Sequence, residues 1–264
     1  MLLGFALAIF VGVTLGMVGS GGTILTVPIL VYIMGVDPIL STTYSLFAIG
    51  VTSSIGAVRG FFRSEVDMHK VLTFGLPSLL MVFITRTFFL PLVPPIIRIG
   101  VWDLHQSVVL MFLFALVMLS SAFAMIQGDD KPIESNETTR KIPLQLVVAQ
   151  GIVVGLVTGV VGAGGGFLII PALVNFYRMP IRRAVSTSLV IITINSFFGI
   201  LGDAEKLEEF NWNLILGYTI FTIVGLFLGF FLSNKVSGTH LKKMFGYMIL
   251  IVALSVLIHE IINL

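Results

Sequence analysis

Long apolar runs without a charged residue set the strongest constraint on how this chain can fold. Three such runs are Val108–Met125, Leu214–Leu232 and Met244–Ile258. A helix needs about 20 apolar residues to cross the hydrocarbon core of a bilayer. The chain is 57% hydrophobic and only 11% charged, whereas soluble domains carry about 25% charged residues. Because isolated strands cannot satisfy their backbone in lipid, the sequence predicts an all-α, polytopic membrane protein.

The chain repeats itself at an offset of 143 positions, so that Gly12 falls on Gly155 and Pro28 falls on Pro171. Internal repeats are common in membrane transporters. A long polar stretch lies between the two copies. We therefore expect a first transmembrane repeat at residues 1–126, a polar linker at 127–142 and a second transmembrane repeat at 143–264. The other matched glycines are Gly16, Gly19, Gly21 and Gly22 with Gly159, Gly162, Gly164 and Gly165.

Each half contains five apolar segments, and its first two segments meet at a glycine cluster. The second segment of each half has about 12–14 residues, which is short for a span and typical of a re-entrant piece. We expect a broken, re-entrant helix hairpin with a glycine tip to open each half, with two full spans as the alternative. The segments lie near residues 2–18, 22–35, 40–59, 71–94, 106–126, 143–161, 166–177, 184–202, 212–233 and 241–262.

Corresponding loops of the two halves carry opposite charge. The loop at 59–70 is basic while its counterpart at 203–211 is acidic, and the loop at 178–183 is basic while the loop around Asp37 has no basic residue. Basic loops stay on the cytoplasmic side of the plasma membrane. The pattern predicts two inverted repeats, a cytoplasmic linker and both termini outside. Inverted repeats with broken helices are typical of secondary transporters, whose substrates bind near mid-membrane.

The glycine clusters predict a binding site for an anion. Glycine allows left-handed backbone and close approach, and the first N–H groups of the helix that follows lack partners and favour negative charge. Polar side chains on the next helix of each half complete the predicted substrate site. Its residues are Gly19, Ser20, Gly21, Gly22, Thr23, Thr43, Ser45, Gly162, Ala163, Gly164, Gly165, Gly166, Ser186, Ser188 and Asn195.

Two structural alternatives apply to these residues. Glycines spaced by four often serve close helix packing, which is the role we expect for Gly12, Gly16, Gly155 and Gly159. Serine and threonine in a span often bond their own backbone.

Arg86 interrupts an apolar run, and an arginine inside a membrane indicates a functional site. We expect it to attract an anion or to gate the pathway, with snorkelling to the outer face as the alternative. No acidic residue is expected deep in an apolar segment. Asp203 comes closest, at a helix end, so the sequence predicts no proton relay.

Other classes of function find no support in the sequence. There is no P-loop, no HExxH motif and no catalytic set, so we expect no enzyme, no catalytic residue, no metal site and no cofactor. A net charge of +2 gives no reason to expect nucleic acid. The expected partners are a small anionic substrate and the lipid bilayer, and the oligomeric state stays open. The chain contains no cysteine.

The two motifs around Gly12–Thr23 and Gly155–Phe167, each followed by a proline, resemble the sulfite exporter TauE/SafE family, also called the 4-toluene sulfonate uptake permease family. The stretches Thr43–Leu46 and Ala184–Leu189 are also similar to its repeat, so the resemblance covers nearly the whole chain. Thr23 departs from the pattern, because it replaces a third clustered glycine.

This resemblance implies a secondary transporter, with export as the expected direction, for small sulfur-containing anions such as sulfite, sulfonates or sulfoacetate. Alternating access would proceed around the paired half-helix N-termini. An anion channel without coupling, or a carrier of a non-sulfur organic anion, is the alternative.

The predicted topology can be tested with reporter fusions. Alkaline phosphatase fused after Leu264 should be active, because the C-terminus is expected outside, while the same enzyme inserted in the linker should be inactive. A cytoplasmic C-terminus would contradict the inverted arrangement.

Overall fold

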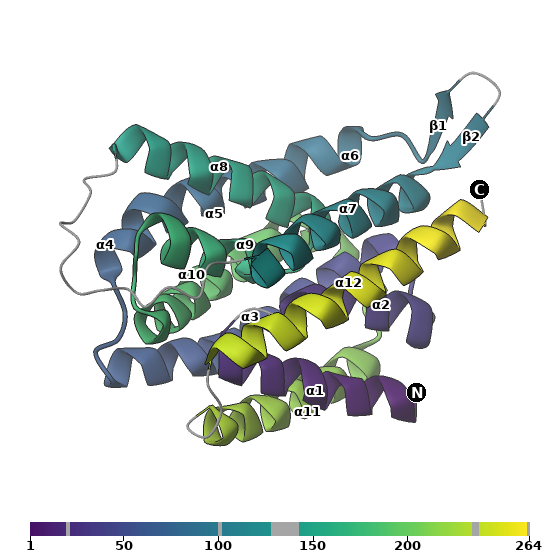
Figure 1. The fold of residues 1–264 in the computed structure, drawn as a ribbon. Coiled ribbons are helices and arrows are strands. Elements are labelled where there is room, and N and C mark those ends of the chain that lie inside the picture. The colour runs from purple at the N-terminus through teal and green to yellow at the C-terminus, as the bar shows by residue number, and fades with distance from the viewer. Residues whose placement is uncertain (20–21, 100–101, 128–142, 234–237, 263–264) are drawn as a thin grey trace.

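The computed structural model describes residues 1–19, 22–99, 102–127, 143–233 and 238–262, and within them the chain forms an elongated helical bundle (Figure 1). Six helical stretches of this part are long and apolar enough to cross a membrane, which confirms the prediction of an all-α polytopic protein. They are Pro38–Phe62, Met68–Leu92, Gln106–Gln127, Leu144–Val161, Ile181–Gly202 and Trp212–Leu232.

The first half has one long composite helix, Met68–Leu92, and one small antiparallel hairpin, which places Ile96 opposite His105. Its elements are α1 (Leu2–Val18), α2 (Thr23–Pro28), η1 (Ile29–Ile33), α3 (Pro38–Phe62), α4 (Met68–Lys70), η2 (Val71–Gly75), α5 (Leu76–Ile84), η3 (Thr85–Phe89), α6 (Leu90–Leu92), β1 (Ile96–Ile99), β2 (Trp102–His105) and α7 (Gln106–Gln127).

The second half follows the same order without the hairpin. Its elements are α8 (Leu144–Val161), α9 (Gly166–Pro171), η4 (Ala172–Phe176), α10 (Ile181–Gly202), η5 (Ala204–Glu209), α11 (Trp212–Leu232) and α12 (Gly238–Ile262). The linker predicted at 127–142 falls almost entirely outside the described residues.

Both halves contain the predicted short helix after a glycine break. The first long helix of each half ends on a left-handed glycine, Gly19 with φ 82° and Gly162 with φ 71°. The next helix begins at Thr23 in the first half and at Gly166 in the second half. Its α-helical part ends at Pro28 or at Pro171 and continues as a π-helical turn, because proline lacks an N–H donor. The 11 residues of each short helix rise about 16 Å, roughly half the hydrocarbon thickness.

The helices pair across the two halves. Helix α1 packs on α11 as α8 packs on α5, while α3 lies along α10 and α7 lies along α12. Exchanging the halves leaves this set of pairs unchanged. Helices α1 and α8 run in opposite directions through the bundle, as do α7 and α12 (Figure 1). Opposite directions are what an inverted repeat requires, and the side of the membrane on which each half begins stays a prediction.

Glycines at equivalent positions of the two halves make equivalent contacts. A Cβ built on Gly56 would lie 2.8 Å from a methyl of Leu189, and a Cβ on Gly199 would lie 2.8 Å from a methyl of Leu46. Helices α3 and α10 are therefore antiparallel and in close contact along their length. The packing role is also confirmed for Gly12, Gly16, Gly155 and Gly159, where a Cβ would come within 1.9 to 2.6 Å of a neighbouring helix.

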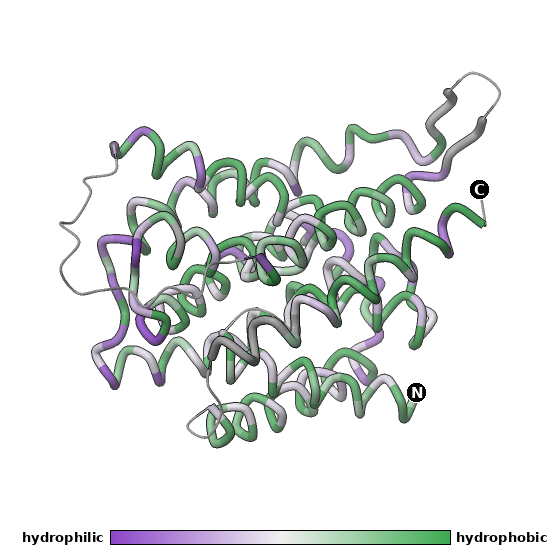
Figure 2. Tube along the Cα trace, in the orientation of Figure 1, coloured by the Kyte–Doolittle hydropathy of each residue, from purple (hydrophilic) through white to green (hydrophobic). Residues whose placement is uncertain are grey.

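The outer face of the bundle is apolar and its interior contains polar groups. On α11, Leu216, Ile220 and Phe227 are exposed, whereas Thr219 and Thr222 are buried. Figure 2 shows apolar residues along the helices, with hydrophilic residues at the turn between α3 and α4 and at the start of α10. This distribution suits a protein whose sides contact lipid and whose ends contact water.

The α1–α11 contact predicts a sharp difference between two glycines of α11. Gly225→Ala should lower stability by about 1–3 kcal/mol, because its Cβ would lie 2.0 Å from the Ile9 carbonyl oxygen. Gly217→Ala is the matched control, since its Cβ would meet the Phe5 ring at 3.2 Å. Thermal unfolding of the purified protein in detergent measures the difference. Equal melting temperatures would contradict the close contact.

Candidate functional site

Each hairpin tip is covered by a long helix of the opposite half. A Cβ on Gly19 would lie 2.6 Å from Val185 of α10, and a Cβ on Gly162 would lie 2.4 Å from Thr42 of α3. Thr42 and Val185 are themselves equivalent in the repeat. The short helices α2 and α9 also contact each other. The two breaks therefore come together inside the bundle.

The backbone of each tip folds back onto a threonine of the preceding helix. A Cβ on Gly22 would lie 1.7 Å from the Thr14 hydroxyl, and one on Gly165 would lie 2.0 Å from the Thr158 hydroxyl. In the second tip Gly164 and Gly165 are also left-handed, with φ 65° and 71°. Glycine is thus required here by conformation and by space. Thr23, Ala163 and Gly166 are buried, and Ser20 and Gly21 lie outside the described residues.

Some of the predicted hydroxyl residues bond to the backbone of their own helix, and others bond to a carboxylate. Ser188 donates to the Val185 carbonyl at 2.8 Å, which is the structural role considered for it. Thr43 donates to Asp203 at 2.8 Å and Ser186 donates to Glu65 at 2.9 Å.

Asn195 and Ser45 bring buried polar atoms that lack partners in the described part of the chain. The amide nitrogen of Asn195 donates to Ser78 at 2.8 Å, but its oxygen has no partner, and neither has the hydroxyl of Ser45. Ser196, which was not predicted, is likewise buried and unpaired, and its hydroxyl would lie 3.3 Å from a Cβ on Gly164. Because unpaired buried polar groups are costly, such groups mark a place for a ligand or water.

Arg86 forms a buried ion pair that the sequence did not predict. Its side chain is 0% exposed and pairs with Asp203 at the end of α10, so the snorkelling alternative is wrong. Asp203 also accepts hydrogen bonds from Thr43 at 2.8 Å and Lys206 at 2.9 Å. Burial raises the pKa of the Asp203 carboxyl, but the charges of Arg86 and Lys206 outweigh it and hold the pKa below its usual value.

Two carboxylates are buried in the bundle, which the sequence did not predict. Asp203 is only 4% exposed and Glu260 is only 8% exposed. Glu260 accepts a hydrogen bond from the Tyr32 hydroxyl at 2.6 Å. Both carboxylates lie near a helix end, as the sequence predicted for Asp203.

The guanidinium of Arg86 lies against the second hairpin tip. A Cβ on Gly162 would lie 2.5 Å from Nη2, and a Cβ on Gly202 would lie 2.7 Å from the Arg86 Cβ. Both glycines therefore make room for this side chain. Its Nε and Nη2 have no hydrogen-bond partner among the described residues. The site thus holds buried cationic donors directly beside the broken helix.

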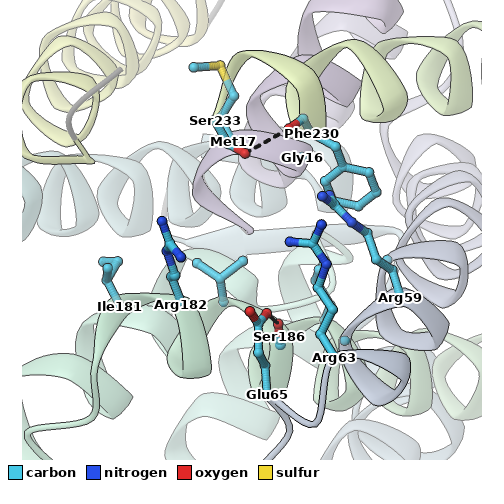
Figure 3. Close-up of a pocket in the computed structure, with 14 residues that line it drawn as sticks. Gly16, Met17, Arg59, Arg63, Glu65, Ile181, Arg182, Ser186, Phe230 and Ser233 are labelled. Carbon is cyan, nitrogen blue, oxygen red and sulfur yellow. Dashed lines mark hydrogen bonds between the residues drawn. The ribbon is translucent and has the colours of Figure 1, made fainter. Parts of the chain in front are cut away.

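Sequence reasoning missed a cavity of about 230 Å³ at the opposite end of α10 (Figure 3). It lies among the ends of α1, α3 and α11 and the start of α10, and Arg59, Arg63, Glu65, Arg182 and Ser186 are among its lining residues. The arginines were interpreted only as markers of topology. Their convergence follows from the antiparallel packing of α3 on α10, which local sequence does not reveal. No group of three or more potential metal ligands occurs in the described part of the chain.

The ion pair predicts a strong response to Asp203→Asn. This change leaves the Arg86 charge buried without a counter-charge, which typically costs about 3–5 kcal/mol. Arg86→Gln together with Asp203→Asn should recover part of the loss, and Glu209→Gln in the same turn serves as the control. Thermal unfolding in detergent at pH 7 measures all four proteins, and an unchanged Asp203→Asn variant would contradict the pairing.

The pH dependence of stability has a definite sign. Because the folded-state pKa of Asp203 is lowered, its contribution is present above the unfolded-state pKa and is lost as the pH falls through the folded-state pKa. The melting temperatures of the wild type and of Asp203→Asn should therefore become equal only at an acidic pH below the usual pKa of an aspartate.

Comparison with known proteins places this chain among membrane transporters. The family model described as sulfite exporter TauE/SafE matches residues 4–256. A probable membrane transporter protein of Xylella fastidiosa is 28% identical over 252 residues, covering 94% of this chain and 91% of that protein. The probable membrane transporter protein YjnA of Bacillus subtilis is 23% identical over 95% of this chain and 97% of its own length.

A further relative matches only part of the chain. The probable membrane transporter protein MJ0441 of Methanocaldococcus jannaschii is 35% identical over 109 residues, which cover 39% of this chain and 40% of that protein. No solved structure shows a significant match. The family match covers nearly the whole chain, as the duplicated glycine motifs indicated, and this protein belongs to the sulfite exporter TauE/SafE family of membrane transporters.

Proposed function

We propose that this protein is a secondary transporter of small sulfur-containing anions, such as sulfite, sulfonates or sulfoacetate, in the plasma membrane. The observation that carries the proposal is the meeting of two broken helices, one from each half, inside the bundle. Transporter sites are typically built where discontinuous helices meet at the repeat interface. The family gives the general function, and its description gives the sulfur chemistry.

The charges beside the second tip support an anionic substrate. Arg86, Asp203 and Lys206 together carry one net positive charge, and the side chains of Arg86 and Asp203 are buried. The Nε and Nη2 atoms of the Arg86 guanidinium have no hydrogen-bond partner among the described residues. Guanidinium N–H groups match oxyanions in geometry. Together with the first N–H groups of α9 they would form a set of donors suited to a small oxyanion.

The two ends of the α3–α10 pair support alternating access. At the Asp203 end, Arg86 fills the space between α5 and α10, whereas at the other end a cavity separates α11 from the start of α10. In an inverted repeat, the closed end opens and the open end closes when the two halves exchange conformations. In the proposed orientation the arginine-lined cavity faces the cytoplasm, the ion pair closes the outer side, and export begins at the cavity.

Counterflow in proteoliposomes tests this function directly. Vesicles loaded with unlabelled sulfite should accumulate labelled sulfite from outside by exchange, and short sulfonates should compete with it. Short carboxylates that compete equally well would instead identify a carrier of non-sulfur organic anions. Anion conductance without exchange would contradict the carrier and favour a channel.

Substitutions in the second tip give a matched test of the site. Gly164→Leu and Gly165→Leu should reduce counterflow at least tenfold, because both positions are left-handed and enclosed. Insertion and monodispersity in detergent should persist, and Gly217→Ala should retain transport. Normal counterflow by the two leucine variants would reject the hairpin site.

A further inference from the structure

The cavity at the cytoplasmic-side end of α3 carries an excess of positive charge. Arg59, Arg63 and Arg182 line it, against a single lining carboxylate, Glu65. In the part of the chain that the structure describes, none of these arginines has an ion pair within 4 Å. Arg59 stacks on the Phe230 ring at 3.8 Å, which holds its guanidinium at the cavity wall. The three cationic groups therefore share one nearby carboxylate and form no ion pair with it.

Figure 3 shows how these side chains are arranged. Arg59 and Arg63 extend from α3 and the turn after it, Arg182 extends from the start of α10, and the Glu65 carboxylate lies at Ser186 between them. The carboxylate accepts a hydrogen bond from Ser186 at 2.9 Å. Glu65 thus lies in the cavity without completing an ion pair there.

The repeat supplies a second, independent observation. At the offset of 143 positions, Ser186 corresponds to Thr43 and Arg63 corresponds to Lys206. Thr43 and Lys206 hold the carboxylate of Asp203 at 2.8 and 2.9 Å. The same pair of groups, a hydroxyl and a cation, therefore already binds an oxyanion at the other end of the molecule.

The position equivalent to Asp203 carries no carboxylate, and Ser186 bonds instead to Glu65 from the turn after α3. Asp203 corresponds to Gly60, whose backbone packs directly against Ser186, since a Cβ there would lie 2.9 Å from the Ser186 Cβ. The cavity of about 230 Å³ exceeds the roughly 30 Å³ share of one water several-fold and is smaller than the ~300 Å³ lower bound of drug-sized pockets. It has room for one small oxyanion and a few waters.

We propose that this cavity is an oxyanion-binding site in which Arg63 and Arg182 clamp the ligand, Arg59 adds charge and Glu65 competes with the ligand for the same space. The site rests on the proposed function, for which it would be the entry point of the substrate. Its ligand is a small sulfur oxyanion or a short sulfonate. The phosphate of an anionic lipid shares this chemistry, and the experiment separates the two sources.

The test measures sulfite and methanesulfonate binding to the full-length protein in nanodiscs of phosphatidylcholine by calorimetry. Arg63→Gln with Arg182→Gln should weaken binding at least tenfold, since two of three cations are lost. Glu65→Gln should strengthen it about threefold to tenfold, since a competing negative charge is removed. Arg183→Gln, which removes one positive charge one residue further along α10 and outside the cavity, should leave affinity unchanged.

The opposite signs of these effects separate binding from misfolding, because a damaged protein would not bind more tightly. A second set of nanodiscs contains phosphatidylglycerol. If this lipid prevents sulfite binding to the wild type, and Arg63→Gln with Arg182→Gln abolishes binding of the lipid, the lipid headgroup is the ligand of the same site. Unchanged affinity in the double arginine variant and in Glu65→Gln would overturn the proposal. If affinity is unchanged in these variants and counterflow is normal, the proposed function stands and only the cavity site is rejected. If binding depends on the arginines but counterflow is absent, the cavity site stands and the proposed transport function is rejected.

Discussion

The absence of water in the bilayer core is the constraint on which the rest of this structure depends. Backbone that leaves helical geometry at that depth must be covered by protein. The chain breaks its helices after Gly19 and Gly162 and covers each break with the long helix of the other half, through Val185 and Thr42. Neither half can therefore shield its own break. The interface that holds the halves together and the place where a substrate would bind are consequently the same region.

The same constraint explains the buried charges. A single arginine inside a membrane is costly, and Arg86 is tolerated because it pairs with Asp203 and contacts the Thr43 hydroxyl. The equivalent place at the other end of α10 keeps the hydroxyl and the cation, has glycine in place of the aspartate, and contains a cavity. One end is thus closed by a carboxylate paired with Arg86, while at the other end three arginines and Glu65, which has no ion pair among the described residues, line a cavity. A repeat whose two copies differ in this way is suited to an exchange between two access states.

Sequence patterns predicted the local features of this fold well. Charge-free runs indicated spanning helices, and glycine followed by a short apolar segment and a proline located the starts of α2 and α9 to within one residue. Such features depend on neighbours along the chain. The contacts that define the candidate site join residues far apart in sequence, such as Arg86 and Asp203, and depend on which helix face meets which. Hence Ser188 was assigned a site role although its hydroxyl bonds its own backbone.

The central claim is that the two ends of the α3–α10 pair open alternately, and spin-label distances test it most directly. The chain has no cysteine, so labels can be introduced in pairs without altering native residues elsewhere. One pair, Phe62→Cys with Leu232→Cys, would report on the arginine-lined cavity, and the other, Phe89→Cys with Leu201→Cys, on the Arg86–Asp203 end. Addition of sulfite should shift the two distance distributions in opposite directions, one end closing as the other opens. Distances at both ends that stay fixed, or that lengthen together, would contradict alternating access.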